Sequence, residues 1–220
     1  ALTPRMGPVH IDLPRDVLGH SSEFVLPQKN QVAKPPIADE TDIKKSVKLL
    51  SEAKKPVILI GAGIKNYGSE GAEAVISLAE LLNAPMTASP GHNDAIPSSH
   101  PLYAGAAGPR GSGLGTKLLK QADVILVLGS RIGFNTSFYS YENINEKATI
   151  IQCEIDQKSI GRYFPVEVGI LADAKTVAKQ LYSSLKTLQL KKEVEEWSRQ
   201  FTKNKKSFLD QREANADTES

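Results

Sequence analysis

Lys54-Lys55-Pro56-Val57-Ile58-Leu59-Ile60-Gly61-Ala62-Gly63 is the stretch that decides the fold of this chain. Its middle residues are apolar without any polar alternation, and Pro56 and the glycines bound them on either side. Such a run is typical of a strand that is buried on both faces, as in a parallel sheet. Gly61 and Gly63 allow the backbone to turn sharply at the carboxyl end of this strand and to approach whatever lies there.

A helix is predicted directly after this strand and its glycine turn. Ser69 is its predicted N-cap, because a serine hydroxyl can accept a hydrogen bond from the first helical turn. The apolar residues that follow repeat at the spacing of one helical face. They are Ala72, Val75, Ile76, Ala79 and Leu82. Strand, turn and helix together predict the first half of a βαβ unit.

Strands and helices continue to alternate along the rest of the chain. Apolar runs predict strands at 86–89, 124–129, 148–156 and 166–173. Helical spacing predicts helices at 39–53 and 114–121, and another helix that Asp173 caps. The glycine-rich segment 91–115 predicts a long irregular loop. This alternation of apolar strands with helices predicts an α/β fold with a doubly wound parallel sheet.

The two ends of the chain predict pieces that do not belong to this sheet. Residues 7–17 alternate apolar and polar side chains and predict a short strand. Residues 21–38 predict a linker, since they are rich in proline and polar residues and have no period. Residues 191–209 predict a charged helix that docks on a domain outside the chain, and residues after Asp210 predict a disordered tail.

Composition excludes several classes of protein. The chain has 220 residues, 40% of them hydrophobic, and a net charge of +2. Without a basic stripe, nucleic acid is not the predicted partner, and no apolar run is long enough to predict a membrane span. The single cysteine, Cys153, lies in an apolar run and predicts a buried thiol in a reducing compartment, the cytoplasm. The four histidines lack metal-ligand spacing, and we expect His92 and His100 to be solvated.

Candidate binding residues follow the carboxyl ends of the predicted strands, where ligands of doubly wound sheets bind. Arg131 could hold a phosphate through its guanidinium, or it could pair with Asp156. Arg110 lies among glycines and could reach the same phosphate, or it could be a solvated loop residue. Glu154 and Asp156 could accept hydrogen bonds from a ribose or an adenine, and Asp156 could instead cap the turn that follows it.

The glycine pattern argues against one common class of nucleotide enzyme. Gly61 and Gly63 lack the third glycine of the dinucleotide fingerprint, because Asn66 stands at that position. The second predicted strand ends at Ser89 without the acidic residue that would bind a ribose. The sequence therefore does not predict a dehydrogenase that uses NAD.

Taken in order, the motifs resemble the central domain of thiamine diphosphate-dependent enzymes of the acetolactate synthase type. That group also includes sulfoacetaldehyde acetyltransferase, glyoxylate carboligase and oxalyl-CoA decarboxylase. The segments that carry the resemblance are 7–17, 55–63, 100–105, 122–131, Ile155-Asp156, Ile160-Gly161-Arg162, 168–170 and Asp173-Ala174-Lys175. The segment 7–17 looks like the last strand of the family's pyrimidine-binding domain.

The resemblance implies a six-stranded, Rossmann-like domain at 39–190 that lies between two cofactor-binding domains. It implies a scaffold with an adenine nucleotide site, which holds FAD in acetolactate synthases and ADP in oxalyl-CoA decarboxylase. The implied cofactor-binding residues are Gly61, Gly63, Ser89, Arg110, Gly129, Arg131, Glu154, Ile155, Asp156, Asp173 and Ala174. The chain departs from FAD-binding members at His92-Asn93-Asp94, at Arg110 and at Gly133-Phe134-Asn135. FAD, ADP, a CoA ester and an empty vestigial site all remain open.

The same resemblance places the chemistry of the family outside these residues. The family's catalytic glutamate would precede Ala1, and its Gly-Asp-Gly motif for magnesium and diphosphate would follow Ser220. The expected parent is a homodimeric or homotetrameric carboligase or decarboxylase that acts on a 2-oxo acid with thiamine diphosphate and magnesium. The chain alone would be inactive, and the remaining domains of the parent would be its partners. The alternatives are a stand-alone regulatory module that binds an adenine nucleotide, and an interaction module without a ligand.

Overall fold

The computed structural model describes residues 5, 7–23, 25, 34–187 and 192–218. The chain forms two units, Ala1–Pro35 and Pro36–Ser220. In the first unit the helix α1 (Arg15–Leu18) follows Pro14, and residues 7–14 belong to no helix or strand. The strand predicted at 7–17 is thus not formed in the described residues, and its assignment to a domain outside the chain stays a prediction. A strand is stabilised by hydrogen bonds to a neighbouring strand, and an alternating pattern alone does not provide that neighbour.

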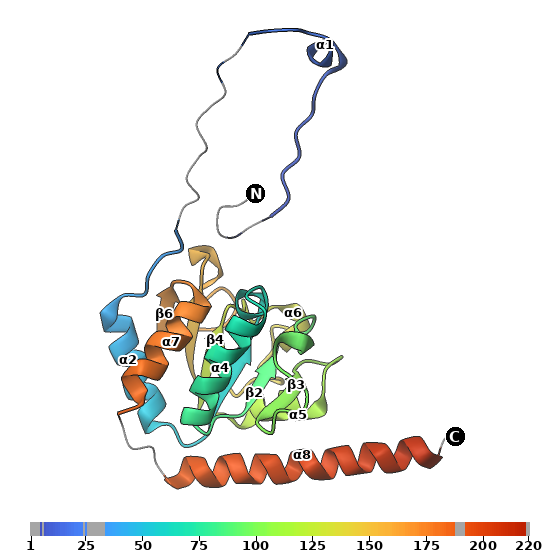
Figure 1. The fold of residues 1–220 in the computed structure, drawn as a ribbon. Coiled ribbons are helices and arrows are strands. Elements are labelled where there is room, and N and C mark those ends of the chain that lie inside the picture. Colours follow the sequence, from blue (N-terminus) through green and yellow to red (C-terminus); the bar gives the residue numbers. More distant parts are fainter. Residues whose placement is uncertain (1–4, 6, 24, 26–33, 188–191, 219–220) are drawn as a thin grey trace. The chain divides into compact units, whose positions relative to one another are not determined.

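The second unit is built on a six-stranded, wholly parallel sheet (Figure 1). Its strands lie in the order β3-β2-β1-β4-β5-β6. They are β1 (Pro56–Ile60), β2 (Met86–Ala88), β3 (Tyr103–Ala106), β4 (Val124–Leu128), β5 (Thr149–Glu154) and β6 (Val168–Leu171). The prediction of a doubly wound, Rossmann-like parallel sheet is confirmed. Strands β1 to β3 are added toward one edge of the sheet and β4 to β6 toward the other, so the strand order switches between β1 and β4.

The strand β3 lies inside the segment 91–115 that predicted an irregular loop, so that prediction is wrong for Tyr103–Ala106. The sequence Tyr-Ala-Gly-Ala lacks the β-branched residues that mark strands. Its place in the sheet depends on β2, because Thr87 donates a hydrogen bond to the carbonyl of Gly105 at 2.8 Å. The segment also contains a short 3₁₀ helix, η1 (Asn93–Ala95).

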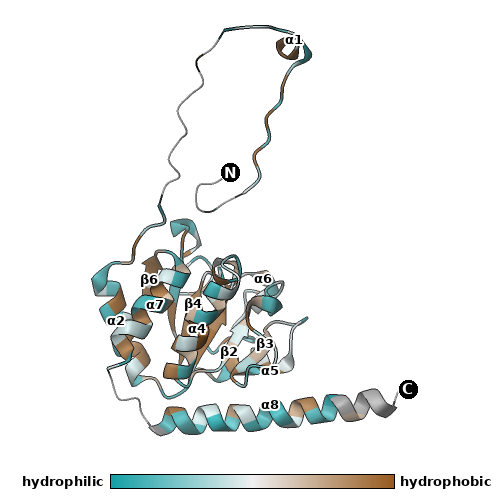
Figure 2. Cartoon of the chain, in the orientation of Figure 1, coloured by the Kyte–Doolittle hydropathy of each residue, from teal (hydrophilic) through white to brown (hydrophobic). Residues whose placement is uncertain are grey.

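Helices cover both faces of the sheet, and the strands labelled β4 and β6 are among the brown, hydrophobic parts of Figure 2. Alternate residues of a strand point to opposite faces. Ile58 and Ile60 accordingly pack with α2 (Glu40–Glu52), α4 (Ser69–Leu81) and α7 (Ala174–Leu185). Val57 and Leu59 pack on the opposite face with α5 (Gly113–Gln121) and α8 (Lys192–Thr218). Cys153 is buried in β5, as predicted. The helices and the second 3₁₀ turn are α2 (Glu40–Glu52), α3 (Ala62–Lys65), α4 (Ser69–Leu81), α5 (Gly113–Gln121), α6 (Phe134–Ser137), η2 (Gln157–Ser159), α7 (Ala174–Leu185) and α8 (Lys192–Thr218).

The starts of α2, α5 and α7 are capped by side chains. Asp39 caps α2 by accepting a hydrogen bond from the Thr41 amide at 2.7 Å. Asp173 caps α7, as the sequence predicts. Ser69 is not the cap of α4, since Gly68 takes that position with φ = 57° and no side-chain hydrogen bond. The left-handed conformation needed at this sharp entry favours glycine over a serine cap.

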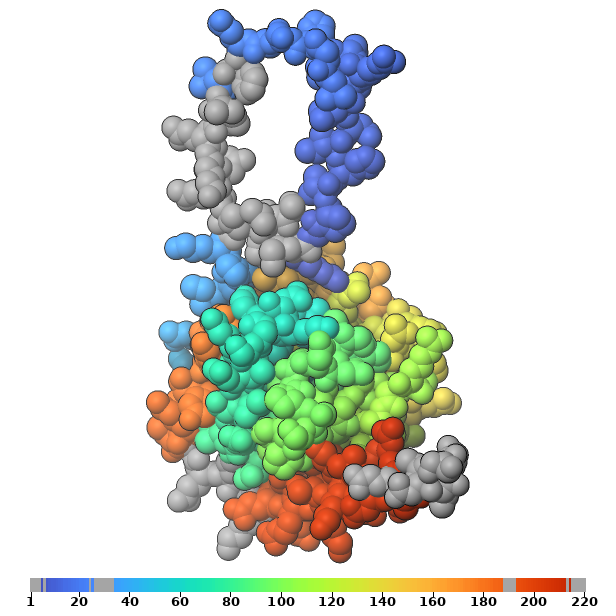
Figure 3. All heavy atoms as spheres, turned by 45° about the vertical axis from the view of Figure 1, so that its right-hand side comes forward, coloured from blue at the N-terminus to red at the C-terminus, as the bar shows by residue number. Residues whose placement is uncertain are grey.

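The helix α8 packs on the sheet domain of its own unit, through the side chains of Trp197 and Phe201. Trp197 is buried and its indole Nε1 donates to the carbonyl of Pro56 at 3.1 Å, at the start of β1. The ammonium of Lys205 donates to the carbonyls of Ser98 and His100 at 3.1 and 2.7 Å. Figure 3 shows α8, in red, lying against the green atoms of the sheet domain. The predicted docking on a missing domain is wrong for Trp197, and the predicted disordered tail is wrong because the helix continues to Thr218.

Within the described ranges, no helix combines the length and the apolar character that a membrane span requires.

Candidate functional site

The turns after β1 and β4 meet at the point where the strand order of the sheet switches. The amide of Gly61 donates to the carbonyl of Leu128 at 3.0 Å, and the amide of Gly63 donates to the carbonyl of Gly129 at 3.2 Å. A Cβ atom on Gly63 would stand 2.7 Å from the Cα of Gly129. These three glycines are thus brought together as predicted, and they are needed because two backbones touch here. Whether a nucleotide also approaches them stays a prediction.

Two buried serines connect the ends of β2 and β4. The hydroxyls of Ser89 and Ser130 are 2.7 Å apart. Gln152, buried in β5, donates from Nε2 to the carbonyl of Ser130 at 3.0 Å. The sequence singled out Ser89 and missed the other two residues. A polar glutamine inside the apolar run of β5 was the signal that could have revealed Gln152.

Glu154, at the end of β5, and Asp156, just after it, make hydrogen bonds within their own segment. Glu154 is buried, and its carboxylate accepts a hydrogen bond from the amide of Ile155 at 3.0 Å. Asp156 accepts from the amide of Lys158 and from the hydroxyl of Ser159, both at 3.0 Å. The alternative in which Asp156 caps the following turn is therefore confirmed. A role of these acids or of Ile155 toward a ribose or an adenine stays a prediction.

Asp173 is held by hydrogen bonds to both of its carboxylate oxygens. It is buried, and one carboxylate oxygen accepts from both the amide and the hydroxyl of Thr176 at 2.8 Å. The other oxygen accepts a hydrogen bond from the hydroxyl of Tyr67. That hydrogen bond, aided by burial, raises the pKa of Tyr67 to about 12. The next residue, Ala174, is the nearest side chain to Gly63, with 3.5 Å between its Cβ and a Cβ built on that glycine.

The pair Tyr67 and Asp173 is flanked by a lysine. The ammonium of Lys175 lies 3.9 Å from the centroid of the Tyr67 ring and 2.8 Å from the carboxylate of Glu70. The hydrogen bond from Lys175 lowers the pKa of Glu70. This network ties α7 to the segment between β1 and α4, so its polar atoms serve the packing of these elements.

The two candidate arginines lie at the surface of the sheet domain. Arg110 and Arg131 are both exposed, the former between β3 and α5 and the latter directly after β4. The phosphate-binding role predicted for Arg131, and its alternative as the ion-pair partner of Asp156, both stay predictions.

The histidines of the 91–115 segment are only partly exposed, so the prediction that both are solvated is wrong in part. Nδ1 of His100 accepts from the amide of Leu102 at 3.3 Å, and Nε2 lies 3.3 Å from the carboxylate of Glu80. Nδ1 of His92 is buried and has no hydrogen-bond partner within the described part of the chain. Burial, followed by the nearby Lys65, lowers the pKa of His92. The loop that predicted solvation is in fact held against the sheet domain.

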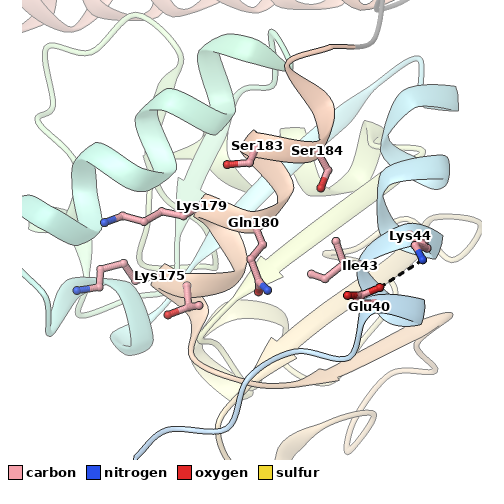
Figure 4. A pocket seen from close by; sticks show the side chains of 9 residues that line it. Glu40, Ile43, Lys44, Lys175, Lys179, Gln180, Ser183 and Ser184 are labelled. Atoms are coloured by element: carbon pink, nitrogen blue, oxygen red, sulfur yellow. Dashed lines mark hydrogen bonds and ion pairs between the residues drawn. The ribbon is translucent and has the colours of Figure 1, made fainter.

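A hollow of about 570 Å³ lies between α2 and α7, away from the glycine turns (Figure 4). Ile43 and Gln180 face each other across it, while the side chains of Lys175 and Lys179 point away from Ile43. Its lining residues are Glu40, Ile43, Lys44, Lys175, Thr176, Lys179, Gln180, Ser183 and Ser184. Sequence reasoning did not point to this hollow.

Comparison with known proteins identifies the family. The model of the family described as thiamine pyrophosphate enzyme, central domain, matches residues 43–181. The chain belongs to this family. The matched range contains every strand of the sheet and begins within α2.

The curated relatives of this central domain are much longer than the chain. A sulfoacetaldehyde acetyltransferase of Roseovarius nubinhibens is 42% identical over 180 residues, which are 81% of this chain and 29% of the relative. A probable acetolactate synthase large subunit of Methanococcus aeolicus is 33% identical, over 84% of this chain and 31% of the relative. The acetolactate synthase large subunit of Corynebacterium glutamicum is 31% identical, over 90% of this chain and 32% of the relative. The central domain therefore spans about a third of the length of the relatives it matches.

The described residues of this central domain offer no ligand cluster for the metal ion that accompanies thiamine diphosphate. Magnesium requires a set of oxygen ligands. In the described ranges no group of three or more His, Cys, Asp or Glu residues is placed to hold a metal ion. The 220 residues also lack a Gly-Asp-Gly sequence.

Proposed function

We propose that the chain is the central domain of a longer enzyme that uses thiamine diphosphate, and that its own role is that of a scaffold. The observation that carries the proposal is the family match over 43–181, on a chain that spans about a third of its curated relatives. The polar groups at the carboxyl edge support the scaffold role, because Asp156 and Asp173 are bonded to neighbouring turns and helices. The other domains of the parent, in a homodimer or homotetramer, would be its partners.

The parent would transfer an acetyl group, since relatives named sulfoacetaldehyde acetyltransferase are 42% identical to this chain. A carboligase or decarboxylase that acts on a 2-oxo acid is the second substrate class, supported by the relatives named acetolactate synthase. The complete coding sequence should be expressed and assayed with sulfoacetaldehyde and with pyruvate, in the presence of thiamine diphosphate and magnesium. We expect turnover by the complete protein and none by the 220-residue chain. Turnover by the chain alone, or a gene that ends at Ser220, would overturn the proposal.

Adenine nucleotide binding is the second candidate function. It is supported by the switch of strand order between β1 and β4, because doubly wound folds bind nucleotides at such a point. It is also supported by Arg131, which is exposed directly after β4. FAD, ADP and CoA should each be titrated into the chain while its melting temperature is followed. A ligand at 100 times its dissociation constant stabilises the native state by about 2.7 kcal/mol. We expect Arg131→Gln to reduce that shift and Arg199→Gln, on the exposed side of α8, to leave it unchanged.

A result without any shift for FAD, ADP and CoA would leave the scaffold as the whole role of the domain. It would also exclude the stand-alone module that binds an adenine nucleotide. The interaction module without a ligand would then be separated from the scaffold by the assay of the complete coding sequence.

A further inference from the structure

Exposed aromatic side chains gather on the segment that follows β4. Phe134, Phe138 and Tyr139 are 52%, 45% and 49% exposed. The ring centroids of Phe134 and Phe138 are 4.7 Å apart, and those of Phe134 and Tyr139 are 5.6 Å apart. Tyr139 also stacks on Tyr163 at 4.3 Å. We call Phe134, Phe138, Tyr139 and Tyr163 the aromatic surface.

The backbone beneath the aromatic surface is strained. Ile132, Phe138 and Tyr139 have φ angles of 51°, 52° and 55°, in the left-handed region that L side chains disfavour. Buried Ser137 maintains this conformation, since its Oγ accepts from the amide of Tyr139 at 3.1 Å. The same Oγ lies 3.3 Å from the carbonyl of Ile132. The strained backbone therefore holds the apolar rings at the surface. Exposing apolar rings to water is unfavourable, so the strain is not explained by the stability of the chain alone.

A second segment is fixed to the first, so that the aromatic surface is one body. Nε2 of Gln152 donates to the carbonyls of Ser130 and Ser159, at 3.0 and 3.3 Å. Its Oε1 accepts from the amide of Gly161 at 2.8 Å. This glutamine joins the turn after β4 to the turn that presents Tyr163. The guanidinium of Arg162 lies 5.3 Å from the centroid of the Tyr163 ring and adds a cation to the aromatic surface.

We propose that the aromatic surface is the docking face for another part of the parent protein, which would present an apolar surface with a carboxylate that meets Arg162. The inference rests on the proposed function, because the relatives have about two thirds of their length outside the matched region. Phe, Tyr and Arg are the residue types that protein interfaces favour. Tyr139 and Tyr163 already stack on each other, so no space is left between them for the ring of a small ligand. A broad contact with a protein surface fits this arrangement better.

The test compares the double variant Phe134→Ser/Phe138→Asn in the complete protein and in the 220-residue chain. Asparagine tolerates the left-handed conformation at position 138, so the local fold is kept. We expect the melting temperature of the chain to fall only slightly, because each ring is about half exposed in it. We expect the complete protein to lose several degrees. The control is Leu209→Ser, on α8, which removes a side chain that is 44% exposed and should affect neither protein.

Equal effects of the double variant in the two proteins would overturn the proposal. A chain that sediments as a dimer, and as a monomer with the double variant, would assign the aromatic surface to a second copy instead. Loss of binding of FAD, ADP or CoA in the double variant, without a stability difference, would assign it to a small ligand. A coding sequence that ends at Ser220 would overturn the proposed function itself, which is a separate outcome.

Discussion

At the scale of single residues, the glycines decide how closely the turns after β1 and β4 approach. A Cβ on Gly61 would stand 2.2 Å from the carbonyl oxygen of Gly129, and one on Gly63 would meet the Cα of the same residue. Backbone atoms cannot move aside as the end of a flexible side chain can. The two glycines of the quoted stretch are therefore fixed by packing, whatever ligand the edge binds.

Gly63→Ala should lower the free energy of unfolding by about 1–3 kcal/mol, because the added methyl group overpacks a backbone contact. Gly113→Ala is the matched control, since nothing lies within 4 Å of its Cβ position and it belongs to α5. That control should be neutral or stabilising, because alanine is the better helix former. Urea denaturation followed by circular dichroism measures both. Equal losses would show that the approach of the two turns is not what the glycine serves.

The hydroxyl of Tyr67 supports a second prediction at this scale, which concerns pH. Its pKa is raised to about 12 by the hydrogen bond to Asp173. The protonated phenol is thus favoured in the folded state, so its stabilising contribution is present below pH 10 and is lost as the pH rises toward 12. Desolvation likewise raises the pKa of Tyr103 to about 12.

Ultraviolet titration of the phenols should therefore show at least two of the six tyrosines, Tyr67 and Tyr103, ionising near pH 12 in the native protein. Tyr67→Phe should remove one of them and flatten the loss of stability above pH 10. Tyr182→Phe, at an exposed position of α7, should change neither property. A late ionisation that survives in Tyr67→Phe with unchanged amplitude would contradict the assignment.

At the scale of elements, the apolar runs predict the strands well where both faces are buried. β1, β4 and β5 carry such runs, and their positions follow from hydrophobicity alone. β3 could not be recognised, because its Tyr-Ala-Gly-Ala sequence is a strand only beside β2. The approach of Gly61 and Gly63 to Gly129 was predictable from strand ends, whereas the link from Gln152 to Ser130 depends on how neighbouring turns lie in space.

The helix α8 shows the same limit. Its apolar spacing revealed a buried side but not the surface that buries it. Trp197→Phe should cost about 1–3 kcal/mol, because the carbonyl of Pro56 loses its donor in a buried position. Leu209→Ala on the same helix should stay within about 0.5 kcal/mol. Denaturation should be followed by circular dichroism, because the variant lacks the single tryptophan and therefore its fluorescence signal. If Trp197→Phe is neutral, α8 is not anchored through that bond.

At the scale of the whole molecule, the single cysteine reports on the integrity of the sheet. Cys153 lies fully buried in β5, and its burial raises the pKa of the thiol. A thiol reagent should leave the native chain unlabelled and should label it only as denaturant unfolds the sheet. The labelling transition should coincide with that seen by circular dichroism if the second unit unfolds as one body. Labelling that precedes it would reveal local opening of β5 and β6.

The pairing of β1 with β4 also has a consequence for how the chain reaches its native state. The amide of Lys55, before β1, and the carboxylate of Asp123, before β4, are joined by a hydrogen bond across 68 positions of sequence. On the ribosome, the apolar strand β1 (Pro56–Ile60) is thus synthesised well before its neighbour β4 (Val124–Leu128). Folding dominated by such non-local contacts is slow, and until synthesis passes residue 128 the nascent strand is a natural substrate for chaperones.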